Sequence, residues 1–465
     1  MLNTTWPYML PLFKEPKKRV KLLMQLFSSP IVMEVLEAIG SAGFISQKDL
    51  INTLRQHSNK TIITILRKLV NAGILEENVV RKRSGLRTVW SKYYKLTDFG
   101  KWFYTLIVDP AKIPKGELRN LMSDIYELFG KSIYDVTRYL DLDPISSIKH
   151  VLYGLAKYIM KGHNGKDIEL LIAGGLSLDH YFKAMNYELS YIRSFLGGDG
   201  PIISLITGKL GLKTGILAEV ACDIWSLKWL INLKKSNISL NYIKLSKDKS
   251  ISENMIIYSA KEDQLRIYRV ISKDKATSPN VDEVEWNRLY DLKAYYAGNT
   301  FIEVACKLSE LARTSNSFFI YRPISESVIQ NPYLFKKIIE NKPILVISKN
   351  TYNEIHENLG ISYERLIDLG VKALLLISKP THITVFTSHS KRVEMMVEGL
   401  KIRNLINTTN TLISFLVYHL LKGEEFVDSA KKALTAAAVM STRSMPYAFP
   451  SQDEVERWNV YISIK

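Results

Sequence analysis

The sequence predicts an α/β protein in two parts: a small basic domain of helices and one β-hairpin, then a larger domain of alternating strands and helices. The apolar spacing is helical in the first 110 residues, whereas short apolar runs alternate with helical stretches from residue 166 onward. The 465-residue chain has a net charge of +17, and residues 1–110 hold 17 Lys and Arg against 8 Asp and Glu. We therefore divide the chain into an N-terminal domain (1–110), a helical connector (111–165) and a C-terminal domain (166–465).

Several classes of site find no support in the sequence. The two cysteines, Cys222 and Cys306, are far apart, and the eight histidines are scattered, so we expect neither a metal site nor a cofactor. The best apolar run, residues 412–421, is interrupted by polar side chains, and the N-terminus lacks the order of a signal peptide. We expect a cytoplasmic protein with no membrane partner.

Three helices are predicted in the basic domain. The first covers residues 28–39. In the second, Ser46 can cap residues 47–54, with Asp49 three residues on. Ser58 can cap the third, whose apolar face carries Ile62, Ile65, Leu66 and Leu69. The second and third helices are joined by a short turn, which predicts a helix-turn-helix.

A β-hairpin with a basic tip follows the third helix. Its strands are expected at 74–81 and 86–96, and no acidic residue lies between Asn78 and Thr97. The segments 72–75 (A-G-I-L) and 94–100 (Y-K-L-T-D-F-G) resemble those that border the wing in bacterial and archaeal winged-helix regulators. The sequence thus predicts a winged helix-turn-helix over residues 28–108.

Double-stranded DNA is the partner expected for this domain. In a helix-turn-helix the second helix enters the major groove, and a basic wing can contact phosphates or the minor groove. The expected contacts are Asn59, Lys60, Thr61, Thr64, Arg67 and Lys68 in the helix and Arg81, Lys82, Arg83 and Arg87 in the wing. A winged helix that mediates only protein contacts is the alternative.

The connector carries three apolar stripes at helical spacing, and Asp143-Pro144 interrupts them. These helices can link the domains rigidly or pair with a second copy of the chain, and the sequence leaves both open. Because winged helices commonly bind DNA as dimers, we expect a homodimer.

The C-terminal domain alternates apolar strands with helices, which predicts an α/β fold with a largely parallel sheet. The expected strands are 169–173, 216–220, 318–321, 344–347, 373–377 and 382–386. Three segments resemble the ribokinase-like (PfkB) carbohydrate and nucleoside kinases: 172–179, which ends in Asp179; 197–200 (G-G-D-G); and 407–415, where that family has D-T-T-G-A-G-D-A-F. This resemblance implies a three-layer α/β/α domain.

Departures from the family pattern point away from catalysis. Asn410, Thr411 and Leu412 replace the glycines that expose backbone N–H groups to the transferred phosphate, and Ile413 stands where the family has its general base. Other matches are incomplete: Ile202 replaces a substrate-binding Asn, 350–353 lacks the acid of N-x-x-E unless Glu354 takes its place, and 379–383 lacks the glycines of a nucleotide turn. The resemblance therefore implies that the domain is not an enzyme.

Part of a ligand pocket remains in the pattern. Asp179, Gly197 and Gly198 match the sugar-binding positions, so a small sugar or nucleoside is a candidate ligand. The alternative is that the glycines form a tight turn and Asp179 pairs locally.

Together these features favour a nucleoid-associated transcription regulator whose kinase-like domain serves as a scaffold, a dimerisation module or a ligand sensor. One alternative is a factor that binds replication origins or organises the chromosome. The other is an active sugar or nucleoside kinase that regulates its own genes.

Overall fold

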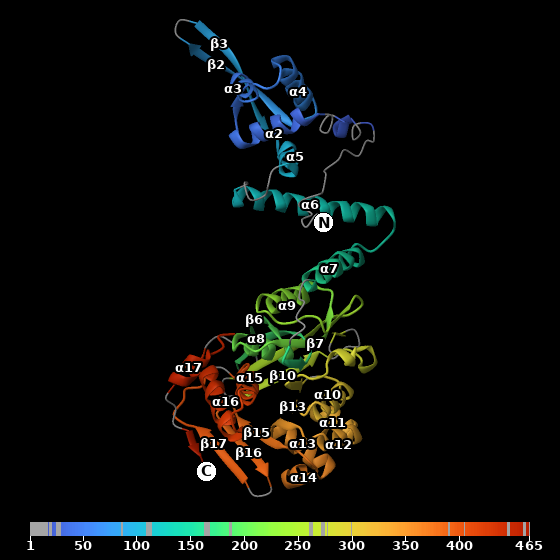
Figure 1. Ribbon diagram of the computed structural model, residues 1–465, viewed down its shortest axis with the longest axis vertical. Coiled ribbons are helices and arrows are strands. Elements are labelled where there is room, and N and C mark those ends of the chain that lie inside the picture. The colour runs from blue at the N-terminus through green and yellow to red at the C-terminus, as the bar shows by residue number, and fades with distance from the viewer. Residues whose placement is uncertain are drawn as a thin grey trace. The chain divides into compact units, whose positions relative to one another are not determined.

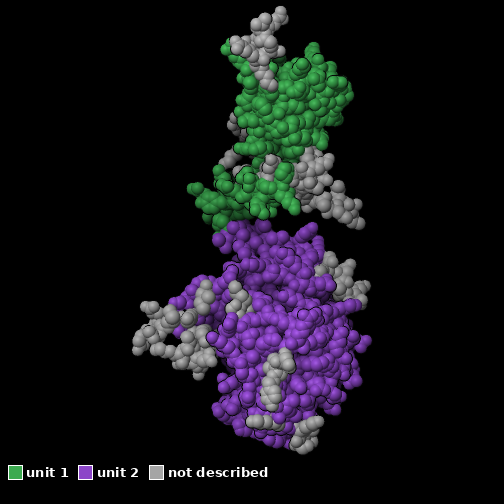
Figure 2. Space-filling model, turned by 90° about the vertical axis from the view of Figure 1, so that its left-hand side faces the viewer, with its two compact units in different colours: residues 1–144 green, residues 145–465 purple. Residues whose placement is uncertain are grey.

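The computed structural model divides the chain into two compact units, residues 1–144 and 145–465 (Figure 2). It describes residues 17, 21–24, 29–84, 87–107, 114–161, 168–185, 188–259, 264–270, 275–276, 278–298, 300–388, 391–403, 405–443, 447–458 and 462–464. The boundary falls inside the expected connector, and the division into three domains stays a prediction.

The first unit contains helices and a hairpin where the sequence predicts them. Its elements are α2 (Pro30–Ala42), β1 (Ile45–Ser46), α3 (Gln47–Thr53), α4 (Asn59–Asn71), β2 (Leu75–Ser84), β3 (Arg87–Leu96), α5 (Asp98–Ile107) and α6 (Lys115–Tyr139). Ser46 Oγ accepts a hydrogen bond from the Asp49 N–H, and Ser58 Oγ accepts one from the Thr61 N–H, so both expected caps form. The apolar faces of α2, α3 and α4 pack into one core.

The hairpin pairs β2 with β3 in antiparallel register from Leu75 opposite Leu96 to Ser84 opposite Arg87. The two-residue strand β1 adds to β3 on the other side, giving the order β1-β3-β2. A strand this short leaves no alternating pattern, so the sequence did not predict it.

The second unit is built on a ten-stranded mixed sheet (Figure 1). Its strands, in spatial order, are β18 (Ile462–Ile464), β17 (Lys391–Val397), β16 (His382–Ser388), β15 (Ala373–Lys379), β14 (Ile344–Ser348), β13 (Phe318–Arg322), β12 (Ala294–Gly298), β4 (Leu170–Ala173), β7 (Thr214–Ala221) and β8 (Ile243–Ser246). The strands from β15 to β8 run parallel, and β16, β17 and β18 extend this sheet antiparallel. The expectation of an α/β domain with a largely parallel sheet is confirmed.

Helices cover both faces of this sheet. They are α7 (Pro144–Met160), α8 (Asp199–Lys209), α9 (Ile224–Lys235), α10 (Ile302–Thr314), α11 (Ser325–Gln330), α12 (Pro332–Glu340), α13 (Lys349–Leu359), α14 (Tyr363–Asp368), α15 (Thr408–Leu421), α16 (Phe426–Ser441) and α17 (Gln452–Arg457). Leu170 and Ile172 of β4 pack with α8, α9, α15 and α16, whereas Leu171 and Ala173 pack with α10 to α14. Because successive strand residues point to opposite faces, one central sheet separates two apolar cores.

A second, smaller sheet flanks the strand ends. Its order is β10 (Gln264–Val270), β9 (Ser250–Ser259), β5 (Ser177–Met185) and β6 (Glu188–Gly197), and β11 (Lys275–Ala276) also pairs with β9. This sheet was not predicted from the sequence, because its strands mix polar, charged and apolar residues without a continuous apolar run.

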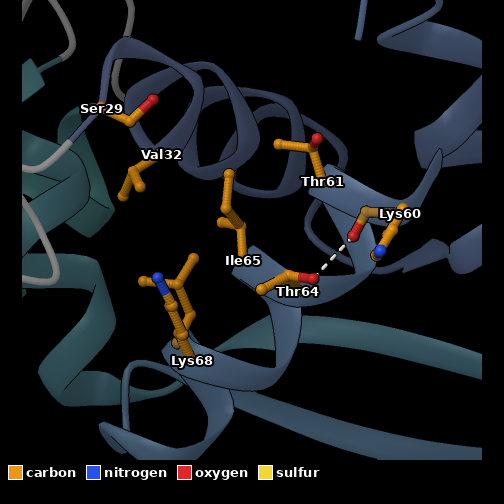
Figure 3. A pocket seen from close by; sticks show the side chains of 8 residues that line it. Ser29, Val32, Lys60, Thr61, Thr64, Ile65 and Lys68 are labelled. Carbon is orange, nitrogen blue, oxygen red and sulfur yellow. Dashed lines mark hydrogen bonds between the residues drawn. The ribbon is translucent and has the colours of Figure 1, made fainter. Parts of the chain in front are cut away.

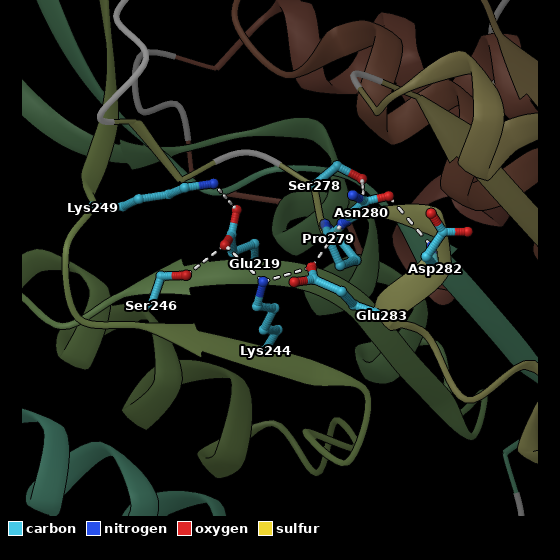
Figure 4. A network of polar contacts seen from close by, with 9 residues as sticks. All are labelled: Glu219, Lys244, Ser246, Lys249, Ser278, Pro279, Asn280, Asp282 and Glu283. Carbon is cyan, nitrogen blue, oxygen red and sulfur yellow. Dashed lines mark hydrogen bonds and ion pairs between the residues drawn. The ribbon is translucent and has the colours of Figure 1, made fainter.

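A buried carboxylate secures the edge of the large sheet (Figure 4). Glu219 on β7 is 2% exposed and accepts a hydrogen bond from Ser246 Oγ on β8. Lys249 Nζ lies 2.5 Å from Glu219 Oε2, and Lys244 Nζ lies 3.5 Å from Oε1 and 2.5 Å from Glu283 Oε2. A buried charge is tolerated only when it is paired and hydrogen-bonded, so both lysines hold β8 against β7.

None of the helices in the described ranges has the length and apolar character needed to cross a membrane.

Candidate functional site

A cavity of about 530 Å³ opens at the carboxyl ends of the parallel strands in the second unit. Arg322, the last residue of β13, and Ser348, the last residue of β14, both line it. The described residues that line it are Asp179, Tyr181, Gly198, Asp199, Asn254, Ile256, Arg322, Pro323, Ile324, Ser325, Ser348, Thr351, Glu354, Leu405, Ile406, Asn407, Thr409 and Asn410. Open α/β sheets bind ligands at this edge, so the cavity is the candidate site.

One wall comes from the small sheet and is centred on Asp179. Asp179 Oδ1 accepts hydrogen bonds from Asn254 Nδ2 at 2.7 Å and from Ser177 Oγ at 2.8 Å. Burial, with the nearby charge of Asp179 adding to it, raises the pKa of Tyr181 and of Tyr447 far above the usual range. This wall presents an oriented carboxylate and the neutral phenol of Tyr181, which suits a ligand rich in hydroxyl groups.

Two glycines allow the wall to close. A Cβ atom on Gly197 would lie between 2.0 and 2.3 Å from the carboxylate of Asp179. Gly198 has a φ of +100°, and a Cβ there would lie 2.2 Å from the carbonyl oxygen of Gly175. Only glycine combines this conformation with such close approaches.

Asp199 follows the glycine pair and begins α8. Its side chain is nearly buried, at 8% exposure of the residue, yet it lines the cavity. Oδ1 accepts a hydrogen bond from the Gly200 N–H at 2.9 Å, and Oδ2 accepts one from Tyr296 Oη at 3.1 Å. Burial raises the pKa of Tyr296 well above its usual value; the charge of Asp199 adds to this effect and Arg322 opposes it. Tyr296 is therefore a neutral donor to a carboxylate.

Another wall is the first turn of α15. Asn407 caps this helix with a φ of +61°, and Asn410 Nδ2 donates to Asn407 Oδ1 at 3.2 Å. Arg322 Nη1 donates to Asn410 Oδ1 at 3.3 Å. The first backbone N–H groups of a helix have no partner within it and carry partial positive charge, so this turn and Arg322 form an electropositive wall.

A third wall belongs to the start of α13. Ser348, Thr351 and Glu354 are spaced three residues apart and all line the cavity. The structure thus brings Glu354 to the cavity in place of an acid at position 353. Among the described residues no group of three His, Cys, Asp or Glu side chains is close enough to hold a metal ion by itself. Magnesium keeps several waters and needs only one or two carboxylates beside the phosphates of its ligand, and Glu354 fits that need.

The residues that the sequence analysis singled out fall into two groups. Asp179 and Gly198 line the cavity, and Gly197 lies against the Asp179 carboxylate. Ile202 and Ile413 are buried in the apolar core, and the segment 379–383 forms the tight turn between β15 and β16, outside the lining. The structure therefore leaves no base at position 413.

Asn254, Arg322 and Asp199 lie at the cavity and were missed as site residues. A charged residue at the carboxyl end of a buried strand was a usable signal for Arg322, as was an acid inside the G-G-D-G turn for Asp199. Asn254 had no local signal, because its strand pairs with β5 across 75 residues of sequence.

In the first unit, most of the expected DNA contacts on α4 point to solvent. Asn59, Lys60, Thr64, Arg67 and Lys68 are exposed, and Thr61 is half-buried. A groove of about 460 Å³ lies beside them, between α4 and the start of α2 (Figure 3). Its lining is Ser29, Val32, Lys60, Thr61, Thr64, Ile65, Lys68 and Leu69.

The hairpin is described in part. Arg81 is exposed, and its guanidinium carbon lies 6.0 Å from the centre of the Trp90 ring. The side chains of Lys82, Arg83 and Arg87 lie outside the described part of the chain. Lys92 and Lys95 form ion pairs with Glu77 and Glu76 at the base of the hairpin.

Comparisons with known proteins assign the fold of the second unit. No protein-family model matches the chain. The 5-dehydro-2-deoxygluconokinase of Shouchella clausii is 21% identical over 318 residues, which are 63% of this chain and 95% of that protein. The ribokinase of Thermotoga maritima superposes with a TM-score of 0.52 at 14% identity, over 62% of this chain and 98% of that one.

This part of the chain has the ribokinase-like fold. A nucleoside kinase of Burkholderia thailandensis, solved with inosine, also superposes, with a TM-score of 0.52 at 14% identity, over 62% of this chain and 95% of that one. The three-layer α/β/α domain expected from the resemblance is therefore confirmed. None of these matches bears on the winged helix-turn-helix.

The comparisons contradict the expected function. The chain was expected to be a DNA-binding regulator, or an origin-binding or chromosome-organising factor, with a domain that is not an enzyme. These expectations are wrong, because the relatives and structural neighbours are sugar and nucleoside kinases and point to a sugar kinase. Ile413 and the missing glycines weighed too heavily in that prediction, whereas Asp199 and Arg322, which line the cavity, were overlooked.

Proposed function

We propose that the ribokinase-like domain is a kinase that transfers the terminal phosphoryl group of a nucleoside triphosphate to a hydroxyl group of a sugar or sugar acid. The observation that carries this proposal is a single cavity with a hydrogen-bonded carboxylate on one wall and an electropositive helix start on another. The names of the relatives agree with this chemistry.

The two walls have different roles, one in binding the substrate and the other in binding the phosphate. Asp179, oriented by Asn254 and Ser177, accepts hydrogen bonds from substrate hydroxyls. Arg322 and the N–H groups that begin α15 face the phosphate, where negative charge develops during transfer. Phosphoryl transfer depends mainly on such positioning and charge stabilisation, with little covalent chemistry required from the protein.

The test is ADP formation by the full chain with ATP and magnesium chloride. The probes are 5-dehydro-2-deoxygluconate, D-ribose and inosine, each with detection of the phosphorylated product by mass spectrometry. We expect one ADP per phosphorylated product with at least one probe. If no probe gives product above a protein-free blank, the proposal is overturned.

For the first unit, we infer a winged helix-turn-helix whose partner is double-stranded DNA, as an accessory to the reaction of the second unit. Supporting this are the exposed Lys60, Arg67 and Lys68 on α4 and the exposed Arg81 on β2. Phosphate contacts from lysine give an affinity that falls with salt concentration.

Fluorescence anisotropy of a labelled duplex at several salt concentrations tests this partner. Replacing Lys60 and Lys68 by alanine should weaken binding and lower the salt slope by about one for each lysine. The control is Lys92→Ala, because Lys92 is already paired with Glu77 at 2.7 Å. Unchanged affinity in the double variant would count against this interface.

We also propose that the chain forms homodimers through α7. Five apolar residues of α7 are between 43% and 73% exposed, at spacings of three or four residues: Ile145, Ile148, Val151, Leu155 and Tyr158. This spacing is typical of a seam between two helices. Light scattering after gel filtration should give a dimer mass, and a monomer mass for Val151→Glu but not for Lys149→Glu, a charge change off the stripe.

A further inference from the structure

The proposed kinase reaction, on which this inference rests, requires an acceptor for the proton of the substrate hydroxyl. The resemblance assigns that role to the position of Ile413, which is fully buried in the apolar core and cannot accept a proton. Another group on the cavity wall must therefore take it.

Three carboxylates line the cavity: Asp179, Asp199 and Glu354. Asp179 Oδ1 already accepts two hydrogen bonds that orient it toward the substrate from the small sheet. Glu354 projects from α13, on the wall that suits the magnesium ion of the nucleotide. Asp199 also accepts two hydrogen bonds, one on each oxygen, but it begins α8 and belongs to neither of these two walls.

Asp199 is also connected to the phosphate-facing wall. Its Oδ2 accepts from Tyr296, the Tyr296 hydroxyl interacts with Arg322, and Arg322 donates to Asn410 in the first turn of α15. This chain of contacts links the Asp199 carboxylate, through Tyr296, to the Arg322 guanidinium and the helix start that would hold the terminal phosphate.

We propose that Asp199 is the catalytic base of this chain. As the substrate oxygen forms its bond to the terminal phosphorus, the O–H proton passes to an Asp199 oxygen. The bond from that phosphorus to the bridging oxygen breaks, and the nucleoside diphosphate leaves with the electron pair. The acid inside the G-G-D-G turn thus replaces the one absent from α15.

Asp199 is surrounded by groups on four different strands and helices. The titratable and charged groups around it in the described residues are Tyr296 on β12, Arg322 at the end of β13, Asp179 on β5 and Glu354 on α13. Tyr296 donates a hydrogen bond to the Asp199 carboxylate, and Arg322 brings a positive charge to the same Tyr296 hydroxyl.

The first experiment compares Asp199→Asn with the unmodified chain, using ATP and whichever probe the unmodified chain phosphorylates. Loss of a general base lowers rates by about 10² to 10⁴. We expect a fall of that size in kcat, with KM changed by no more than a few-fold. The matched control is Asp428→Asn, an exposed aspartate at the start of α16, with unchanged kcat.

The second experiment uses Tyr296→Phe and the pH profile of kcat. Tyr296 would be a positioning residue, since its hydroxyl stabilises the carboxylate without touching substrate. Removing it should move the acidic limb of the profile to higher pH, because the ionised base loses a donor. A merely structural role for Asp199 would leave the position of this limb unchanged. This profile also decides the matter if Asp199→Asn does not fold, as judged by its melting temperature.

The outcomes separate the two proposals. If the unmodified chain turns over a probe but Asp199→Asn keeps its kcat, Asp199 is not the base and the kinase proposal stands. The same holds if the limb stays in place in Tyr296→Phe. If the unmodified chain turns over no probe, the kinase proposal fails, and the role of Asp199 fails with it.

Discussion

Two walls of the cavity offer different kinds of ligand-binding group, side chains on one and backbone N–H groups on the other. The wall of β5 and β9 acts through side chains, with the Asp179 carboxylate held by Asn254 and Ser177. The wall at the start of α15 acts largely through backbone N–H groups, with Arg322 as the added charge. A side-chain function is lost when its residue changes, whereas a backbone function survives substitution if the chain keeps its conformation.

This difference explains why the α15 segment misled the sequence analysis. Its missing glycines were interpreted as a lost anion site, but α15 still begins at the cavity, and every residue except proline supplies an N–H group. Asn407 takes the left-handed conformation that caps the helix, and asparagine tolerates this conformation better than most residues. When an anion site is formed by backbone N–H groups, the structure therefore shows better than the sequence whether the site is intact.

The largest effect is expected at Gly198, because the wall that contains Asp179 closes only with the backbone conformation of this glycine. Gly198→Ala places a Cβ atom 2.2 Å from the Gly175 oxygen at a φ of +100°. Strain and the clash together should lower the free energy of unfolding by about 3 kcal/mol or more and abolish turnover. Urea unfolding followed by circular dichroism measures the change.

Gly211→Ala is the control for Gly198→Ala. Gly211 also has a positive φ, +89°, but a Cβ there meets nothing within 4 Å. Gly211→Ala should lower the free energy of unfolding by only about 1–2 kcal/mol, because its strain comes from the backbone conformation alone. Equal losses in the two variants would show that the turn, and not its contact with Gly175, decides stability.

The next effect tests the side-chain wall directly. Asp179→Ala removes the acceptor of the substrate hydroxyls and leaves Asn254 without its 2.7 Å partner. A hydrogen bond to a charged group contributes about 1.5–3 kcal/mol, so KM should rise by about 10- to 100-fold with a smaller change in kcat. Steady-state kinetics with the active probe measure both constants. A fall in kcat at constant KM would instead place Asp179 in the chemical step.

A smaller effect is expected on the backbone wall. Asn407→Gly keeps the left-handed cap available, whereas Asn407→Ala must adopt a φ near +61° at a cost of about 1 kcal/mol. If the anion site lies in backbone N–H groups, the glycine variant should keep kcat and the alanine variant should lose up to about fivefold. Equal loss in both variants would mean that the Asn407 side chain is needed.

The sequence predicted the large sheet better than the site. Buried parallel strands such as β14 and β15 are continuous apolar runs, so their positions follow from composition alone. The small sheet has no such run, and with it the partner of Asp179, Asn254, stayed hidden. Tyr296, which donates to Asp199, lies near Arg322 because β12 and β13 are neighbours in the sheet. Motif matching compares one position at a time, and it could not find a base that comes from a different element.

The smallest effect is expected at the C-terminal end of α15, where the contacts in question are made by side chains and not by backbone groups. His419 Nδ1 and Lys432 Nζ lie 2.9 and 2.8 Å from the Glu424 carboxylate. Burial raises the pKa of Glu424, and the hydrogen bonds from Lys432 and His419 outweigh it, so the pKa is lowered. The contacts of Glu424 with His419 and Lys432 therefore stabilise the fold at any pH above the ordinary glutamate pKa. This stabilisation is lost as the pH falls through the lowered pKa of Glu424. Glu424→Gln should cost about 0.5–1 kcal/mol at pH 7 and progressively less as the pH falls below the ordinary glutamate pKa. Glu425→Gln is the control, because Glu425 makes no side-chain hydrogen bond at the cap of α16. A loss from Glu424→Gln that did not shrink in acid would mean that packing, and not charge, fixes this end of α15.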